Sequence, residues 1–257
     1  MKSGSRHPKL KHYWRRFQII ALRVDMVRAH TLGDDEAMVE DTVEISRLAN
    51  DDDRWSDAQR YSPQAKQKAR NLGSSSLQAR ADFQLALALI GTGDYVEALM
   101  TFESVMPELR RGGDPAPLAA GLLNVGLVND RLGRANEAAA VWREAATVAR
   151  SAGDRSQLCS ALIDLGSLCF GEGEYKGASE HWSQALKIAR QLKDTTRTAK
   201  VTYCLGVVAF QEGKFTQADE FLTESRALLQ RLGRSDLAAR AADYLARLPR
   251  DRAAQDI

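Results

Sequence analysis

The chain contains little cysteine and no long hydrophobic run, and both features limit its class. Its 257 residues include three cysteines, Cys159, Cys169 and Cys204, without CxxC spacing. An odd count without this spacing predicts neither a disulfide framework nor a zinc site. No stretch reaches the roughly 18–20 apolar residues of a membrane span, and residues 1–7 lack the apolar core of a secretory signal. We therefore expect a cytoplasmic protein without a membrane partner.

The sequence motifs of common catalytic sites are missing as well. The histidines, His7, His12, His30 and His181, are far apart, and none has the HExxH spacing of a zinc protease. The chain has neither a phosphate-binding GxxxxGKS/T segment nor a GxSxG nucleophile turn. We therefore predict that the protein is not an enzyme and that it uses no metal and no cofactor.

The charges nearly balance, with a net charge of +2, but their distribution is uneven. Basic residues are concentrated at the N-terminus, and a second basic run, Lys66, Lys68 and Arg70, lies in the interior of the sequence. Such segments allow an alternative function, in which the protein associates with nucleic acid through its N-terminal arm. The other interpretation of the arm, over residues 1–13, is a solvated and partly disordered leader. The basic residues at the N-terminus are Lys2, Arg6, Lys9, Lys11, Arg15 and Arg16.

A glycine recurs at every fortieth position in the middle of the chain, and an alanine follows each glycine five positions later. A fixed period of this length indicates one supersecondary unit that is repeated along the chain. The spacing predicts a first helix before each glycine and a second helix after it. The glycines are Gly93, Gly133, Gly173 and Gly213, and the alanines are Ala98, Ala138, Ala178 and Ala218. The expected first helices are 76–92, 116–132, 156–172 and 196–212, and the expected second helices are 94–111, 134–151, 174–191 and 214–231.

A weaker copy of the unit lies upstream, where Gly33 precedes Gly93 by one and a half periods instead of one. We therefore expect an insertion of half a period between the two copies, as a polar loop or as a lengthened helix broken at Pro63. The predicted organisation is a basic arm over 1–13, a degenerate first repeat over 14–50, an insertion or linker over 51–75, four repeats over 76–234, a capping helix over 235–249 and a tail over 250–257.

These positions resemble the tetratricopeptide repeat family in its long-repeat variant. Small residues occupy the first helices seven positions before each glycine, and large ones follow the second-helix alanines by four positions. The small residues are Ala86, Gly126, Gly166 and Gly206, and the large ones are Phe102, Trp142, Trp182 and Leu222. The resemblance implies an all-α, right-handed superhelical α-solenoid of about five helix-turn-helix repeats with a C-terminal capping helix. It also implies similarity to the repeat regions of bacterial signalling and regulatory proteins.

In this family the first helices line a concave groove, so the resemblance also implies a binding surface. Apolar and aromatic side chains with a few polar groups suit an amphipathic helix or an extended peptide. The implied function is a non-catalytic protein or peptide interaction module in bacterial signalling or regulation. Packing of the same side chains against second helices is the alternative, and self-association is left open. The candidate groove residues are Arg80, Phe83, Gln84, Leu87, Asn124, Leu127, Arg131, Asp164, Phe170, Lys200, Tyr203 and Val207.

Overall fold

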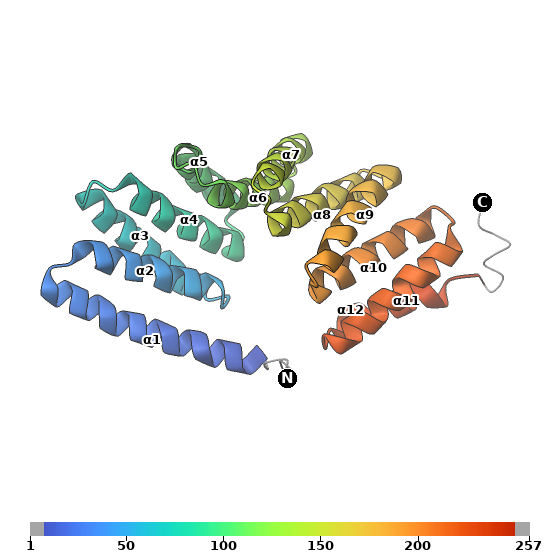
Figure 1. The fold of residues 1–257 in the computed structure, drawn as a ribbon, viewed down its shortest axis with the longest axis horizontal. Coiled ribbons are helices and arrows are strands. Elements are labelled where there is room, and N and C mark those ends of the chain that lie inside the picture. The colour runs from blue at the N-terminus through green and yellow to red at the C-terminus, as the bar shows by residue number, and fades with distance from the viewer. Residues whose placement is uncertain (1–7, 250–257) are drawn as a thin grey trace. The chain divides into compact units, whose positions relative to one another are not determined.

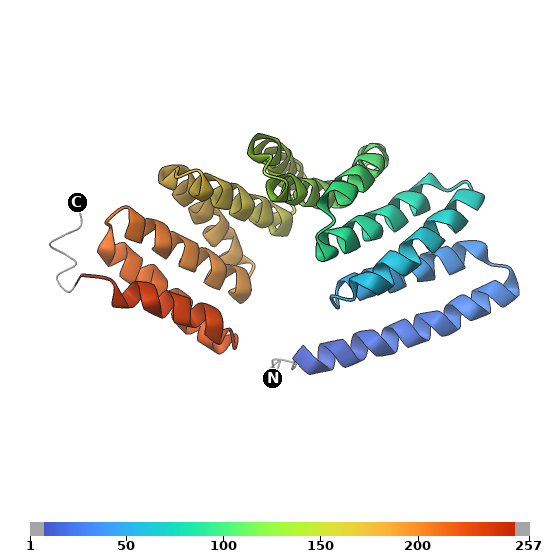
Figure 2. The ribbon, with the colours of Figure 1, turned by 180° about the vertical axis from the view of Figure 1, so that it is seen from behind.

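The computed structural model of the protein describes residues 8–249, and within this range the chain forms α-helices and no β-strand. It consists of two compact units, Met1–Arg134 and Ala135–Ile257. Within each unit, consecutive helices pack against one another (Figure 1), and the view from behind shows the same order (Figure 2). The prediction of an all-α solenoid is therefore confirmed. Residues 1–7 of the predicted arm and the predicted tail over 250–257 lie outside the described residues.

Apart from the first and the last, which have 25 and 12 residues, the described helices contain 16 to 18 residues each. Unit 1 contains α1 (Pro8–Leu32), α2 (Asp35–Asn50), α3 (Trp55–Asn71), α4 (Ser75–Thr92), α5 (Tyr95–Arg111) and α6 (Pro115–Arg131). Unit 2 contains α7 (Ala135–Ser151), α8 (Arg155–Gly171), α9 (Tyr175–Gln191), α10 (Thr195–Gln211), α11 (Phe215–Arg231) and α12 (Ser235–Ala246).

The turns between helices follow a stricter rule than the sequence suggested. In the described part of the chain, residues with positive φ occur at every twentieth position from Gly33 to Gly233. Nine of these eleven positions are glycine, and the other two are Asp53 (φ 58°) and Lys193 (φ 55°). Glycine is favoured there because it has no Cβ to clash in the left-handed region. One helix with its turn is thus the structural step, and two such steps make one repeat.

This shorter step corrects the expected organisation of the N-terminal third. The loop or broken helix expected over 51–75 was wrong, because α3 runs continuously through Pro63. Pro63 lies on an exposed side of α3, where water can hydrate the carbonyl group that loses its partner. Gly33 lies three steps before Gly93. Turns within a repeat and turns between repeats alternate along the chain. Because the number of steps is odd, Gly33 lies at a turn between repeats and does not join the two helices of one repeat.

Helix capping supports this corrected register. The first helices α2, α4, α6, α8 and α10 begin after side chains that accept a backbone N–H hydrogen bond, and these caps recur at every fortieth position. The second helices α3, α5, α9 and α11 begin without a side-chain cap. Since α2 belongs to the capped class, α2 and α3 form a repeat and α1 is an additional helix before it. The caps are Asp34, Ser74, Asp114, Asp154 and Asp194.

Close approach of the two helices explains the small residues of the repeat. A Cβ atom on Gly166 of α8 would lie 2.6 Å from the ring of Trp182 in α9. The indole N–H of Trp182 donates to the Ile163 carbonyl at 3.0 Å, which fixes the ring in this position. Gly206 has the same relation to Leu222, whose Cγ would be 2.6 Å away. Each large side chain therefore fills the space that the glycine leaves on the neighbouring helix.

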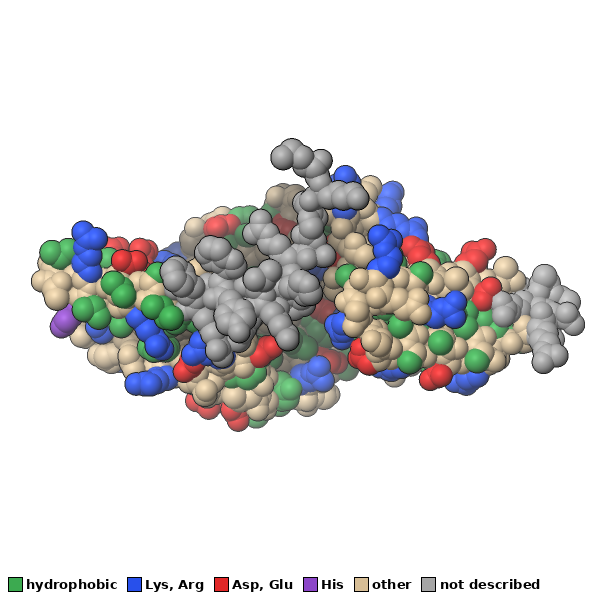
Figure 3. Space-filling view, turned by 90° about the horizontal axis from the view of Figure 1, so that it is seen from below, with side chains coloured by type: hydrophobic (Ala, Val, Ile, Leu, Met, Phe, Trp, Pro, Cys, Tyr) green, Lys and Arg blue, Asp and Glu red, His purple; other side chains and the backbone are tan. Residues whose placement is uncertain are grey.

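Helix α1 has apolar side chains on two sides. Ile19 is buried and packs with Ile45 and Leu48 of α2. On the other side, Ile20 and Val24 are 58% and 62% exposed, and hydrophobic side chains are visible on this outer surface of the unit (Figure 3). The inner face of α1 thus completes the core of unit 1, while the apolar side chains on its outer face are exposed.

Candidate binding site

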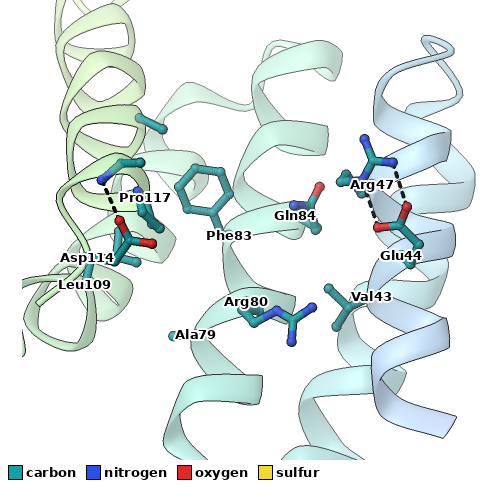
Figure 4. A pocket seen from close by; sticks show the side chains of 12 residues that line it. Val43, Glu44, Arg47, Ala79, Arg80, Phe83, Gln84, Leu109, Asp114 and Pro117 are labelled. Atoms are coloured by element: carbon teal, nitrogen blue, oxygen red, sulfur yellow. Dashed lines mark hydrogen bonds and ion pairs between the residues drawn. The ribbon is translucent and has the colours of Figure 1, made fainter. Parts of the chain in front are cut away.

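Unit 1 contains an open pocket of about 430 Å³ among α2, α4, α5 and α6. First helices supply most of its lining, because α2 and α4 lie side by side and α6 begins next to α4. In Figure 4 the Phe83 ring points into the space between Pro117 and Gln84. The pocket is lined by Val43, Glu44, Arg47, Ala79, Arg80, Phe83, Gln84, Leu109, Asp114, Ala116, Pro117 and Ala120.

The charged side chains of this pocket are paired. Arg47 donates to both carboxylate oxygens of Glu44, at 2.6 and 2.8 Å, and to Asp51 at 2.9 Å. Arg80 contacts Glu40 of α2 at 3.3 Å. The Asp114 carboxylate accepts the backbone N–H of Ala116 and so caps α6. The pocket thus presents hydrogen-bonding groups with little excess charge around an apolar floor.

One polar and one aromatic side chain of the pocket, Gln84 and Phe83, are held in position by neighbouring residues. Asn50 of α2 donates to the backbone carbonyl of Gln84 at 2.8 Å and to its side-chain oxygen at 3.1 Å. The Phe83 ring packs edge-on against the ring of Phe102 in α5, with centroids 5.5 Å apart. Asn50 was not identified from the sequence, although its place at the end of α2 follows once α2 is recognised as a first helix.

The structure brings only part of the predicted groove of unit 1 together. Arg80, Phe83 and Gln84 line the pocket. Leu87 is half-buried against the core around Ala86 and Phe102. The predicted residues of α6 lie outside the pocket: Asn124 donates to the carbonyl of Ala120 at 2.8 Å, Leu127 is half-buried, and Arg131 is exposed at the helix end.

In unit 2 the predicted groove residues separate into core and surface. Val207 is buried in the core formed with Ala218 and Leu222. Phe170 is half-buried and lies 5.8 Å from the Trp182 ring. These two side chains therefore stabilise helix packing, as the alternative interpretation expected for part of the set. Asp164 is half-buried on α8, Lys200 is exposed and Tyr203 is half-buried on α10.

Lys200 and Tyr203 line a second pocket, of about 370 Å³, formed by α10, α11 and α12. Burial raises the pKa of the Tyr203 hydroxyl and raises the pKa of the Cys204 thiol to about 11. Both groups are therefore neutral near pH 7, and Cys204 is a poor nucleophile there. The lining consists of Thr196, Ala199, Lys200, Tyr203, Cys204, Leu229, Leu232, Arg234, Leu237 and Arg240.

Two side chains of the internal basic run are engaged in contacts between helices. Lys66 forms an ion pair with the buried Asp82 at 2.8 Å. Lys68 contacts the Met38 sulfur at 2.9 Å. The arm residues Lys2 and Arg6 lie outside the described residues. The internal basic run is thus partly used in contacts between helices.

Among residues 8–249, no group of three or more His, Cys, Asp or Glu side chains is arranged to hold a metal ion. None of the described helices combines the length and the hydrophobicity that a membrane crossing requires.

Comparison with known proteins gives a family match for the middle of the chain. Residues 117–191 match the family model described as tetratricopeptide repeat. The matched segment includes α8 and α9, whose glycine and tryptophan packing is described above. No curated protein has a significantly similar sequence.

Several solved structures share the fold. BtubC (BKLC) from P. vanneervenii has a TM-score of 0.74 and 18% identity, over 85% of this chain and 92% of that chain. A Rap protein complexed with competence and sporulation factor has a TM-score of 0.64 and 18% identity, over 96% and 74%. The apo quorum sensor NprR from B. thuringiensis has a TM-score of 0.73 and 14% identity, over 92% and 68%. The expected resemblance to tetratricopeptide repeat proteins is therefore confirmed at the level of the fold.

Proposed function

We propose that this tetratricopeptide-repeat chain is a non-catalytic interaction module that binds a protein segment or peptide on the inner sides of its first helices. The observation that carries the proposal is the pocket of unit 1, where three first helices meet around Phe83. The solved structures with this fold include a Rap protein complexed with competence and sporulation factor and a quorum sensor. We infer that the chain acts in bacterial signalling or regulation in a comparable way.

The chemistry of the pocket favours a peptide. A peptide backbone offers alternating N–H and C=O groups, which need both acceptors and donors on the protein. Gln84 supplies an amide, and the guanidinium groups of Arg47 and Arg80 supply further donors. Their pairing with Glu44 and Glu40 removes most of the net charge, so the pocket does not favour a charged segment. Hydrogen bonds to these groups would offset the cost of taking a peptide backbone out of water.

The apolar part of the pocket provides the anchor. Phe83, Leu109 and Pro117 line a space of about 430 Å³, which can accept one or two side chains of a bound segment. Since Phe83 is fixed by Phe102, the anchor surface is formed before binding and requires little ordering.

The test blocks the pocket without removing a core side chain. Ala120 of α6 lines the pocket and is half-buried, so Ala120→Arg places a long side chain in the binding space while it keeps a strong helix former. A charged residue at Phe83 would be a poorer choice because it breaks the contact with Phe102. The matched control is Ala140→Arg, at an exposed alanine of α7.

The measurement is affinity capture from host lysate by the wild-type protein and both variants, followed by titration of the retained protein. We expect Ala120→Arg to lose a specific partner that the wild type and Ala140→Arg retain. The circular dichroism spectra and melting temperatures of all three should agree. Retention of the same proteins by all three would contradict the proposed function.

A further inference from the structure

The pocket of unit 2 differs in charge from that of unit 1, because its lining contains three cations and no carboxylate. Lys200 extends from α10, Arg234 precedes α12, and Arg240 lies within α12. Arg234 has a counter-ion in Asp236, at 3.8 Å. Neither Lys200 nor Arg240 forms an ion pair with another described residue. The lining therefore carries positive charge that the described part of the chain does not neutralise.

The floor of this pocket is apolar. Leu229, Leu232 and Leu237 line it together with Ala199 and Cys204. Leu232 is 38% exposed, although leucine is among the residues most often found inside proteins. A volume of about 370 Å³ is enough for a branched aliphatic side chain with its flanking backbone.

Arg240 is positioned by an aromatic side chain. Its guanidinium carbon lies 5.8 Å from the centre of the Tyr203 ring, and the Tyr203 ring in turn packs edge-on against Tyr244 at 6.2 Å. Stacking on an aromatic face restricts a guanidinium group and leaves N–H donors at its edge for a carboxylate. The Arg240 guanidinium group is therefore held at the edge of the pocket and does not sample many rotamers in solvent.

We propose that this pocket binds an acidic peptide segment in which an aliphatic residue is flanked by carboxylates. The aliphatic side chain enters the space among Leu229, Leu232 and Leu237. The flanking carboxylates pair with Lys200 on one side and with Arg240 on the other. Charge complementarity selects this occupant, since a basic or neutral segment would leave two cations at the pocket unpaired.

The inference rests on the proposed function, because it assigns a ligand chemistry to a second pocket on the first helices. It can still fail separately. The block at Ala120 tests unit 1, whereas the experiment below tests unit 2 with a defined probe.

The probe is the capped peptide acetyl-Gly-Asp-Leu-Asp-Gly-amide, titrated into the isotope-labelled full chain and followed by amide chemical shifts. Two matched peptides accompany it, one with asparagine in place of both aspartates and one with glycine in place of leucine. The protein variants are the double change Lys200→Gln and Arg240→Gln, and a control with Lys176→Gln and Lys187→Gln. The control removes two exposed cations of α9, outside the pocket.

We expect shifts at Lys200, Tyr203 and Arg240, and an affinity about tenfold higher for the aspartate peptide than for either matched peptide. The pocket double variant should lose about the same factor, and the control should not. Binding should weaken as salt is added. Equal affinity for the asparagine peptide, shifts confined to other parts of the chain, or an unaffected pocket variant would each overturn the inference. If Ala120→Arg still abolishes partner capture, the proposed function survives that failure.

Discussion

Two helix pairs at the same position of the repeat, α2–α3 in unit 1 and α8–α9 in unit 2, solve the same packing problem with different residues. In α8–α9 the helices approach at Gly166, and Trp182 covers the glycine. In α2–α3 the equivalent positions, three repeats earlier, hold Ser46 and Ser62, and both are buried. The alanine of the second helix is common to both pairs and fully buried, as Ala58 and as Ala178.

The difference shows which parts of the repeat are indispensable. Both pairs keep the left-handed turn and the second-helix alanine, whereas the contact between a large and a small residue is present only in α8–α9. In unit 1 an aromatic side chain reaches the next first helix from another place, since Trp55 at the start of α3 lies against Gly91 of α4. The backbone register therefore depends on the left-handed turns and on the close contact at the second-helix alanine. The large residue can occupy a different position of the repeat.

The largest effect should come from Gly166→Leu. The new side chain would overlap the fixed ring of Trp182, so we expect a loss of about 3 kcal/mol in the free energy of unfolding, as for severe overpacking. Urea denaturation followed by circular dichroism measures it. The control is Gly171→Leu, at a position of the same helix where a Cβ meets no atom within 4 Å; it should change stability by less than about 0.5 kcal/mol. Equal losses in both variants would remove the contrast between the two pairs.

The turns give a smaller effect of the opposite sign. Lys193 adopts a left-handed conformation that costs a non-glycine residue roughly 1 kcal/mol. Lys193→Gly should therefore raise the free energy of unfolding by about 0.5–1 kcal/mol. Asp53→Gly should raise it less, because aspartate tolerates this region better than lysine. Urea denaturation of both variants measures the changes, and a loss of stability in Lys193→Gly would mean that this turn does not behave like the glycine turns.

The serine pair of unit 1 can be tested at Ser62. Its hydroxyl is buried and has no hydrogen-bond partner among the residues that the structure describes, whereas the Ser46 hydroxyl donates to the Thr42 carbonyl at 3.0 Å. Ser62→Ala removes an unsatisfied polar group, so we expect a gain of up to about 1 kcal/mol. Ser46→Ala removes a satisfied group and should give no gain. Thermal melts of the two single variants compare them directly, and a clear loss in Ser62→Ala would assign the hydroxyl a structural role.

The smallest effect concerns pH and unit 2 alone. Burial lowers the pKa of His181 on α9, and Arg143 lowers it further, while Glu180 opposes the shift. Between the lowered pKa and about pH 6.5, the unfolded chain therefore binds more protons than the folded chain. His181 thus contributes to a loss of stability as the pH falls through this range. Denaturation at several pH values should show a weaker decline in His181→Gln than in the wild type. Identical pH profiles would assign the decline to other groups.

The sequence predicted the helices after residue 75 well because several signals coincide there. The glycine, the alanine five positions later and the capping residue all recur with one period. The bounds of the eight repeat helices agree to within one residue, and the capping helix ends three residues earlier than expected. The region before residue 75 was harder because Asp53 and Ser62 replace the most visible markers. Ala58 was the remaining signal, since it lies one repeat before Ala98 and has the same burial.

The pockets could be predicted only in part. Arg80, Phe83, Lys200 and Tyr203 were identified as exposed toward a ligand from the register of the first helices, and each lines a pocket. Val207 was not distinguished from them, because its burial depends on how closely α11 and the capping helix pack on α10.

By itself the sequence determined the helical class, the repeat length and the positions of the turns after residue 75, because these depend on local conformational preferences and on spacing along the chain. Only the tertiary structure decided which first-helix side chains face a pocket and which fill the core, and which cations find a counter-ion. Those outcomes depend on contacts between helices, such as Asn50 with Gln84, Glu40 with Arg80 and Arg240 with Tyr203. Such contacts join residues from different helices, far apart in the sequence, and the local pattern of hydrophobic and polar residues does not specify them.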